Sequence, residues 1–436
     1  MAQLGLSNIS NTIKPVLTNL LTNSQWMAMS GSTLENVGSN LVTSWVNLAG
    51  SYETFTSSGA NISSAISTGG TDTACSNITF TNGKLYKVIA TLTLNSGLAP
   101  TIGSGAANAG TANGGLASRL LIAGVNTIVF EANSDTACIW LQNLGATNFS
   151  CTFTLYEVTP GYVAADSLAP DGWSKDSVTD IFRQHNDGTL TKNGSFYSLK
   201  IVETAAAAGQ AIQWPNTGTY ALSEHIKKFA GRTMSFGVWA KTSVAASVVI
   251  EIYDGVSLCT STHTGGGGWE WLECTGTVRS AATQFRVLLY VRQIDTAYFS
   301  QPMLVFGSSI SEGLFQPIPN EVIWLQTYVV TTTYNGDSGT PSVNSNINLE
   351  AETKGQIGKG IKAIDIWIRA LNTTPAKGMN ILPSTGKQIL RVTSQVTGIV
   401  NDATGWINCD SNGDIRVEFE DANFNFSLIR INAIQT

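Results

Sequence analysis

The chain has little charge and almost no histidine. Among its 436 residues Lys and Arg number 24, Asp and Glu 30, and His 3, so charged residues reach 12% against an average near ~25%. The net charge is -6 and no run of Lys or Arg occurs, which argues against a nucleic-acid partner. No apolar stretch reaches the ~18 residues of a membrane span. No basic segment precedes an apolar core at the N-terminus, so we expect no secretory signal.

The cysteines lack metal-binding and redox spacing. They form no C-x-x-C pair and none stands near a histidine at zinc-ligand spacing, the six being Cys75, Cys138, Cys151, Cys259, Cys274 and Cys409. Reduced thiols in a chain made in a cytoplasm are therefore expected. The alternative concerns Cys259 and Cys274, which flank the turn Gly265–Gly268 and would form a disulfide if they faced each other across a hairpin.

What the chain has in abundance is the material of β-structure. Hydrophobic residues make up 43% and glycines number 42, and Ser, Thr and Asn occur throughout, as in short strands joined by tight turns. Alternation of apolar and polar residues is clear at 85–94, 363–369 and 426–432, and 233–240 is a further predicted strand. The sequence therefore predicts an all-β protein of tandem β-sandwich or jelly-roll domains.

The length of the chain and its proline-containing stretches suggest where the domain boundaries lie. At ~150 residues per domain the length predicts about three, and Pro-containing stretches at 160–170 and 315–319 are linker-like. We expect an N-terminal docking arm or short helix at 1–18, a jelly-roll-like domain at 19–159, a second jelly roll at 160–318 and a C-terminal β-sandwich at 319–436. A frayed terminus is the alternative for the arm.

Several motifs of the central region carry a family resemblance. They are Gly194-Ser-Phe-Tyr-Ser-Leu-Lys200, Met234-Ser-Phe-Gly-Val-Trp-Ala-Lys241 and Tyr298-Phe-Ser-Gln-Pro-Met-Leu304. On these motifs the segment from about Asp171 to Ser308 resembles the carbohydrate-binding-module-like jelly rolls of bacteriophage tail, fibre and capsid-appendage proteins.

The resemblance implies a function. It implies a non-enzymatic virion structural protein (a fibre, spike, or capsid or tail appendage), assembled in the host cytoplasm and contributing to host attachment. It also implies a homo-oligomer, with a trimer favoured, that contacts other virion proteins through its N-terminal segment. Two alternatives stay open: a glycan-binding adsorption protein that holds host surface polysaccharide, and a polysaccharide-degrading enzyme of the tailspike type.

Four tryptophans are candidates for glycan binding, because indole rings stack on the apolar faces of sugars. Trp173 and Trp214 adjoin loop residues, which predicts exposure. Trp269 and Trp271 share one strand face, and for these two a place in the core is the favoured interpretation.

No cofactor is expected, and one weak calcium candidate exists. Asp410, Asn412 and Asp414 place oxygen side chains at alternate positions, as calcium loops do. An Asn–Gly hairpin turn between two strands is the favoured interpretation of that stretch. In the resembling family an Asp of the last strand helps to hold a structural calcium, whereas Ser300 and Thr154 stand at the matching positions here.

Catalysis has no positive signal in the sequence. Gly336-Asp337-Ser338-Gly339 resembles the nucleophile loop of chymotrypsin-like proteases. The histidines that such a serine needs, His185, His225 and His263, all lack the context of that family. Acid pairs drawn from Glu251, Asp254, Glu270 and Glu273 have no spacing that indicates a glycosidase. We therefore predict that the protein is not an enzyme.

Overall fold

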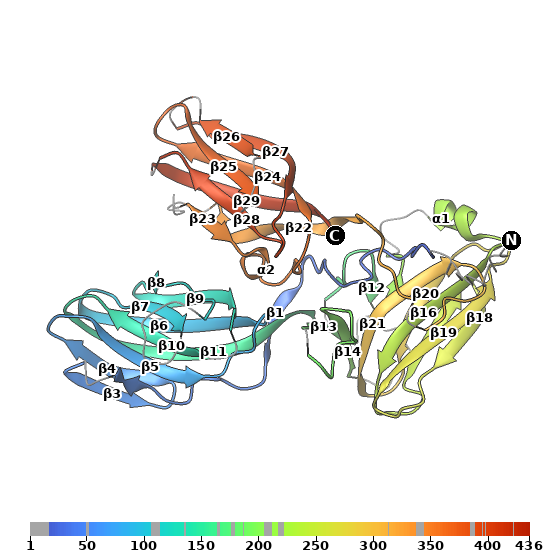
Figure 1. Cartoon of the computed structure of the whole chain (residues 1–436), viewed down its shortest axis with the longest axis horizontal. Coiled ribbons are helices and arrows are strands. Elements are labelled where there is room, and N and C mark those ends of the chain that lie inside the picture. The colour runs from blue at the N-terminus through green and yellow to red at the C-terminus, as the bar shows by residue number, and fades with distance from the viewer. Residues whose placement is uncertain are drawn as a thin grey trace, which may run out of the picture.

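The computed structural model confirms an all-β protein. It describes residues 17–48, 52–105, 114–134, 137–163, 166–175, 179–185, 187–204, 212–216, 222–312, 314–336, 344–383, 389–394, 396, 398–421 and 423–436. Within these residues antiparallel strands form five sheets, and the sheets build three β-sandwiches (Figure 1). Neither helix in the described part of the chain has the length or apolarity of a membrane span.

The first sandwich, blue to cyan-green in Figure 1, packs two sheets around its own core. One sheet contains β1, β3, β4, β6, β9 and β11, and the other has the order β2-β5-β10-β7-β8. The strands are β1 (Thr33–Val37), β2 (Val46–Asn47), β3 (Thr54–Ser58), β4 (Asn61–Ser67), β5 (Asp72–Ile78), β6 (Leu85–Gly97), β7 (Thr101–Gly105), β8 (Arg119–Leu120), β9 (Gly124–Glu131), β10 (Ala137–Asn143) and β11 (Thr147–Tyr162).

The second sandwich, green to yellow, follows directly. Its sheets run β19-β16-β21-β14-β13 and β12-β15-β20-β17-β18. Its elements are β12 (Ser174–Lys175), β13 (Thr179–Gln184), β14 (Ser198–Glu203), β15 (Ile212–Trp214), α1 (Leu222–Phe229), β16 (Thr233–Lys241), β17 (Val248–Tyr253), β18 (Ser257–Thr262), β19 (Trp269–Thr277), β20 (Arg286–Val291) and β21 (Asp295–Phe306).

The third sandwich, orange to red, has two four-stranded sheets of order β22-β29-β24-β27 and β23-β28-β25-β26. Its elements are β22 (Val322–Asn335), β23 (Ser345–Ile347), α2 (Leu349–Glu352), β24 (Ala363–Asn372), β25 (Lys377–Pro383), β26 (Leu390–Ser394), β27 (Asn401–Asn408), β28 (Ile415–Phe419) and β29 (Phe424–Gln435). The predicted alternation is clear in β24, where Ile364, Ile366 and Ile368 enter the core and the residues between them stay partly exposed.

One long strand joins the first two sandwiches. β11 pairs with β6 along most of its length and then, at Gly161 and Tyr162, with Phe182 and Ile181 of β13. The sheets of the two sandwiches thereby form a single 11-stranded sheet. The strand passes the predicted boundary at 159/160 without a break.

The N-terminal described segment does not pack where the sequence placed it. Trp26 lies in the core that the second and third sandwiches share, with its ring 5.2 Å from that of Trp173. The Asn19 side chain donates to Pro302 O at 3.0 Å, and Ala28 forms a β-bridge with Ile357. Residues 17–32 thus pack between the second and third sandwiches before the chain enters the first. The predicted arm at 1–18 lies outside the described residues up to residue 16.

A buried ion pair connects the second and third sandwiches. Arg183 of β13 donates to Glu350 of α2 at 3.0 Å, and both side chains are almost fully buried, at 0% and 1% exposed. The same carboxylate oxygen accepts from Tyr197 at 2.8 Å and lies 3.1 Å from His185. Burial by itself would raise the pKa of Glu350, but the charges and hydrogen bonds of His185 and Arg183 outweigh it and hold this pKa below its usual range.

Removing the charge of Glu350 should destabilise the protein. In Glu350→Gln the Arg183 guanidinium stays buried without its counter-charge, which costs about 3–5 kcal/mol. We expect a clear fall in the midpoint of thermal or urea unfolding. The matched control is Glu418→Gln, since Glu418 pairs with Arg416 at 2.7 Å but is 35% exposed, and its loss should cost under about 1 kcal/mol. Equal midpoints for the two variants would contradict the role given to the buried pair.

A second buried carboxylate makes stability depend on pH. Glu321 precedes β22, and its Oε1 accepts from Asn23 N at 2.7 Å. Burial raises the pKa of Glu321 from 4.5 to about 7, against the opposing effect of that hydrogen bond. Because the pKa is higher in the folded protein than in the unfolded chain, the folded state binds this proton more tightly. The stabilisation is present below about pH 4.5 and is lost as the pH rises to about 7.

Glu321→Gln should remove this dependence. The wild-type protein should lose up to about 3 kcal/mol of stability through this group between pH 4.5 and pH 7, whereas the amide does not titrate. Unfolding midpoints measured at several pH values across that window test the expectation. Parallel pH profiles for the two proteins would refute it.

Candidate functional site

The outer face of the second sandwich carries a pair of tryptophans. In β16 Met234, Phe236 and Val238 enter the core, which turns Gly237 and Trp239 to the other face. Trp239 stands opposite Trp271 of β19, with ring centroids 5.7 Å apart at 62°. Trp271 can lie flat on the sheet because Gly237 has no side chain: an added Cβ would stand 2.3 Å from its ring.

A tight turn holds an ammonium group over Trp239. Ser195 N donates to Lys192 O at 3.0 Å, and Gly194 within this turn has φ +89°, which favours glycine. Lys192 Nζ consequently lies 3.4 Å from the centroid of the Trp239 ring. That geometry is a cation–π contact. In the described part of the chain no carboxylate lies within ion-pair distance of this ammonium.

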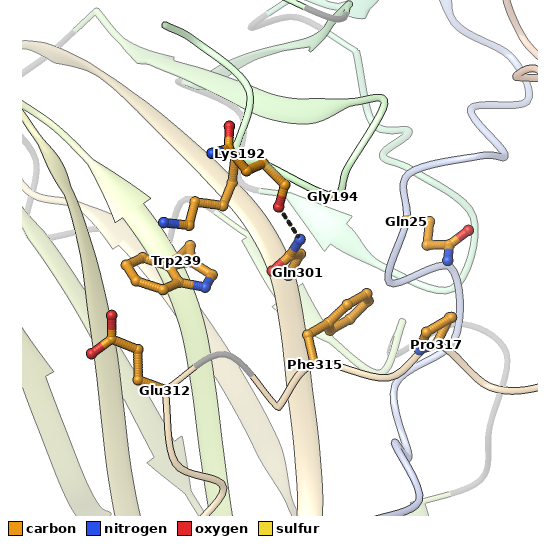
Figure 2. Close-up of a pocket in the computed structure, with 9 residues that line it drawn as sticks. Gln25, Lys192, Gly194, Trp239, Gln301, Glu312, Phe315 and Pro317 are labelled. Carbon is orange, nitrogen blue, oxygen red and sulfur yellow. Dashed lines mark hydrogen bonds between the residues drawn. The ribbon is translucent and has the colours of Figure 1, made fainter. Parts of the chain in front are cut away.

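A β-bulge in β21 supports the turn that carries Lys192. The register of β16 and β21 shifts between Gly237 and Trp239, and Gln301 in the bulge has φ +56°. This conformation directs the Gln301 amide to the turn, where it donates to Asn193 O at 3.2 Å and to Ser195 Oγ at 2.9 Å. Figure 2 shows the bond to the turn beside the Lys192–Trp239 contact.

The segment after β21 closes the other side. The Glu273 carboxylate accepts from Trp271 Nε1 at 2.9 Å and from Ile310 N at 2.8 Å. One side chain thereby anchors both the Trp271 ring and the segment that carries Glu312 and Phe315. Glu312 lies near the edge of Trp239 on the side away from Lys192 (Figure 2).

A groove runs over the second sandwich from Trp239 and reaches Lys359 and Gly360 of the third sandwich at one end. It consists of two adjoining hollows of about 710 and 230 Å³, which share Gln25, Gly194 and Phe315. Four aromatic residues line it: Trp239, Phe315, Phe196 and the largely buried Tyr197. Between them stand the Gln25 and Gln301 amides, Lys192 and Lys359, and the Glu312 carboxylate. The groove therefore combines apolar ring faces with donors and acceptors of hydrogen bonds.

The four tryptophans of the sequence prediction are distributed differently from what we expected. Trp173 is 0% and Trp214 5% exposed, so the expectation of exposed loop positions is wrong for both. The reason is the N-terminal segment, which covers them: Thr22 accepts from Trp173 Nε1 with its backbone oxygen and from Trp214 Nε1 with its hydroxyl. Trp269 and Trp271 are partly exposed on the outer face of the sheet and do not belong to the main core.

The weak calcium candidate forms a turn. Asp410 Oδ1 accepts from Asn412 N at 2.9 Å and from Asp414 N at 2.8 Å. The turn joins β27 to β28, which lie in opposite sheets, so it is a connection between sheets and not the hairpin that we expected. In the described residues no group of three His, Cys, Asp or Glu side chains is arranged to hold a metal ion.

The cysteines and the protease-like motif add no chemistry to the groove. Cys259 and Cys274 are free thiols in contact with each other, and this contact raises the pKa of Cys274 above its usual range. Ser338 lies outside the described residues. His185 contacts Glu350, and His263 Nδ1 accepts from Gly265 N at 2.8 Å. The His225 side chain also lies outside the described part.

The four acids considered at the sequence level all have structural partners. Glu251 accepts from Tyr290 at 2.7 Å, and Asp254 pairs with Arg279 at 2.9 Å. Glu270 accepts from Thr264 at 2.9 Å. Together with Glu273 they support loops and strands of the second sandwich.

Sequence reasoning missed Lys192, Phe315 and Trp239 as groove residues. The available signal for Trp239 was its place in an alternating strand, one position out of phase with Met234, Phe236 and Val238. For Lys192 the signal was the Asn193–Gly194 turn beside it. The turn at Lys192 and the strand of Trp239 come together because of the bulge at Gln301, and no local sequence pattern predicts that bulge.

Comparisons with known proteins give no sequence family. No model of a protein family matches the chain, and no curated protein matches it. Among solved structures, the CBM22-1 and GH10 modules of the Clostridium thermocellum xylanase 10B, complexed with xylohexaose, align at 12% identity and a TM-score of 0.25. That alignment covers 33% of this chain and 27% of the xylanase chain.

A tandem of two CBM22 modules from Paenibacillus barcinonensis Xyn10C aligns at 10% identity with a TM-score of 0.24, over 64% of this chain and 97% of that one. The cycloalternan-forming enzyme of Listeria monocytogenes, in complex with a pentasaccharide substrate, aligns at 9% identity with a TM-score of 0.17, over 83% and 30% of the two chains. At these identities the likeness concerns the β-sandwich fold alone.

The packing of Trp271 on Gly237 yields a test of the site. In Gly237→Ala the new Cβ would displace the Trp271 ring and loosen the Trp239–Trp271 pair. We expect a loss of about 1–3 kcal/mol in stability and a changed near-ultraviolet circular dichroism signal. Gly266→Ala is the control, because a Cβ there meets nothing within 4 Å. Indistinguishable spectra and midpoints for the two variants would contradict the described packing.

Proposed function

We propose that this protein binds oligosaccharide chains in the groove that runs from Trp239 of the second sandwich to Lys359 of the third. The observation that carries the proposal is that Trp239, Phe315 and Phe196 line one groove together with the Gln25 and Gln301 side chains. Sugar rings have apolar C–H faces and polar rims. Aromatic rings with interspersed amides match both parts of such a ligand.

The charges of the groove favour an uncharged saccharide. Lys359 is paired with Glu131, so its charge is largely compensated. The other two charged side chains of the groove, Lys192 and Glu312, lie on either side of Trp239, and their opposite charges sum to zero (Figure 2). An ammonium that donates and a carboxylate that accepts suit neighbouring sugar hydroxyls. Because Lys192 covers the Trp239 ring in the free protein, we expect a bound sugar to displace this ammonium towards a hydroxyl.

The groove supports binding better than hydrolysis. Most glycosidases place two carboxyl groups on either side of the scissile bond. Among the described residues that line this groove, Glu312 is the one carboxylate. A reducing-sugar assay with the polysaccharides that bind tests this part of the proposal, and product above the blank would overturn it.

The role in a virion and the trimeric assembly stay predictions that rest on the sequence resemblance. Glycan binding is compatible with both, since host attachment requires recognition of a surface polysaccharide. The solution mass of the full chain, measured by light scattering, tests the assembly. We expect three times the chain mass, and a monomer would contradict the trimer.

Two groove variants test the proposed function. Lys192→Ala and Phe315→Ala each remove a group from the groove surface, and losing one contact worth about 1 kcal/mol weakens binding roughly fivefold. Affinity electrophoresis in gels that contain xylan, hydroxyethylcellulose or galactomannan measures the change. Ile294→Ala serves as the control, because Ile294 is 68% exposed in the same sandwich and is not part of the groove. Unchanged mobility of both groove variants would refute the proposal.

A further inference from the structure

The third sandwich has an aromatic outer face. In β24 Ile364, Ile366 and Ile368 enter the core, so that Asp365, Trp367 and Arg369 lie on the opposite face of the sheet. The neighbouring strands add further rings to this face. We call it the aromatic face and define it by Trp324, Tyr328, Trp367, Arg369, Trp406 and Arg430.

The strand register places these residues in rows. Trp324 of β22 stands opposite Ala433 of β29, Ala433 opposite Asp365, and Asp365 opposite Trp406 of β27. The two tryptophans therefore end one row that crosses all four strands, three strand spacings or roughly 14 Å apart. In the adjacent row Arg430 stands opposite Trp367.

Guanidinium groups stack among the rings. Arg430 lies 3.9 Å from the Tyr328 ring centroid and 5.6 Å from that of Trp367, while Arg369 lies 4.5 Å from Trp367. Arg430 Nε donates to Asn432 Oδ1 at 3.0 Å, and Asn432 in turn donates to Asp365 at 3.4 Å. These contacts fix the arginines in place, so the face is ordered before any ligand arrives.

The outer members of the face remain open to solvent. Trp324 is 65%, Tyr328 53% and Trp406 37% exposed. Three large aromatic side chains exposed together on one sheet are uncommon on a surface without a binding role. None of them lines the groove beside Trp239.

We propose that the aromatic face is a second, separate binding surface for an uncharged oligosaccharide. The row from Trp324 to Trp406 spans several linked sugar rings and not one. Exposed ring faces suit the C–H surfaces of the sugars, while Arg430, Asn432 and Asp365 between them offer donors and acceptors to hydroxyl groups.

The charges of the face select this ligand over a polyanion. Arg369 lies 3.7 Å from Asp402, and Asp365 lies beside Asn432, the partner of Arg430. Two arginines and two aspartates leave the face without net charge, whereas nucleic acids and acidic polysaccharides need an excess of cations. A neutral ligand pays no charge penalty here.

Binding by the full chain to neutral polysaccharides in native gels tests the inference. The variants are Trp324→Ala and Tyr328→Ala. The neutral probes are xylan, hydroxyethylcellulose and galactomannan, and alginate is the acidic probe. Ile389→Ala is the control, because Ile389 is 57% exposed next to β26 in the opposite sheet of the same sandwich. Because all three side chains are exposed, each variant should lose no more than about 1 kcal/mol of stability, a loss that includes the Tyr328–Arg430 contact.

We expect each face variant to weaken binding to at least one neutral polysaccharide by about fivefold to tenfold, with Ile389→Ala unchanged. Adding Phe315→Ala should weaken it further, since the groove is a separate site. Wild-type affinity of both face variants for every probe would overturn the inference, and so would retardation by alginate alone. A face variant with a lower solution mass than the wild-type protein but unchanged binding would also overturn the inference, because the aromatic face would then be a contact between copies of the chain.

Discussion

The arrangement of this protein depends on one buried carboxylate. One oxygen of Glu350 in α2 accepts hydrogen bonds from Arg183 of β13 and Tyr197 and contacts His185, and all three partners belong to the second sandwich. An ion pair in a dry interior stabilises less than its Coulomb energy suggests, because both charges lose their hydration. The Arg183–Glu350 pair instead restricts the geometry of the junction: a shift of the third sandwich relative to the second would leave a buried charge without its partner. The groove lies beside this junction, so the same contacts fix its width.

The sequence predicted the class of fold well, because strand alternation is a local property. Segments such as 85–94 and 363–369 alternate clearly, and both became strands with one face in a core. Sheet membership was beyond reach. The turn from Asp410 to Asp414 has the residues of a hairpin, yet its flanking strands diverge into different sheets. Turn chemistry is decided within a few residues, whereas the partner of a strand is decided by side chains far away in the chain.

The candidate site was predicted only in part, for a related reason. Trp173 has loop residues as neighbours, but a segment about 150 positions earlier covers it and accepts its indole hydrogen. Trp239 was not among the candidates, and in the structure a lysine side chain covers its ring. Exposure depends on long-range packing, so neighbouring residues in the sequence could not show that Trp173 and Trp214 are buried. The ring of Trp271 likewise has room on the outer face only because Gly237 on the adjacent strand lacks a side chain.

The long strand β11 has a mechanical consequence. The backbone continues as one strand from the first sandwich into the second and pairs with β13 at Gly161 and Tyr162, unlike domains joined by a flexible linker. A pull on the first sandwich is therefore resisted at the junction by backbone hydrogen bonds between β11 and β13, and not by a flexible linker alone.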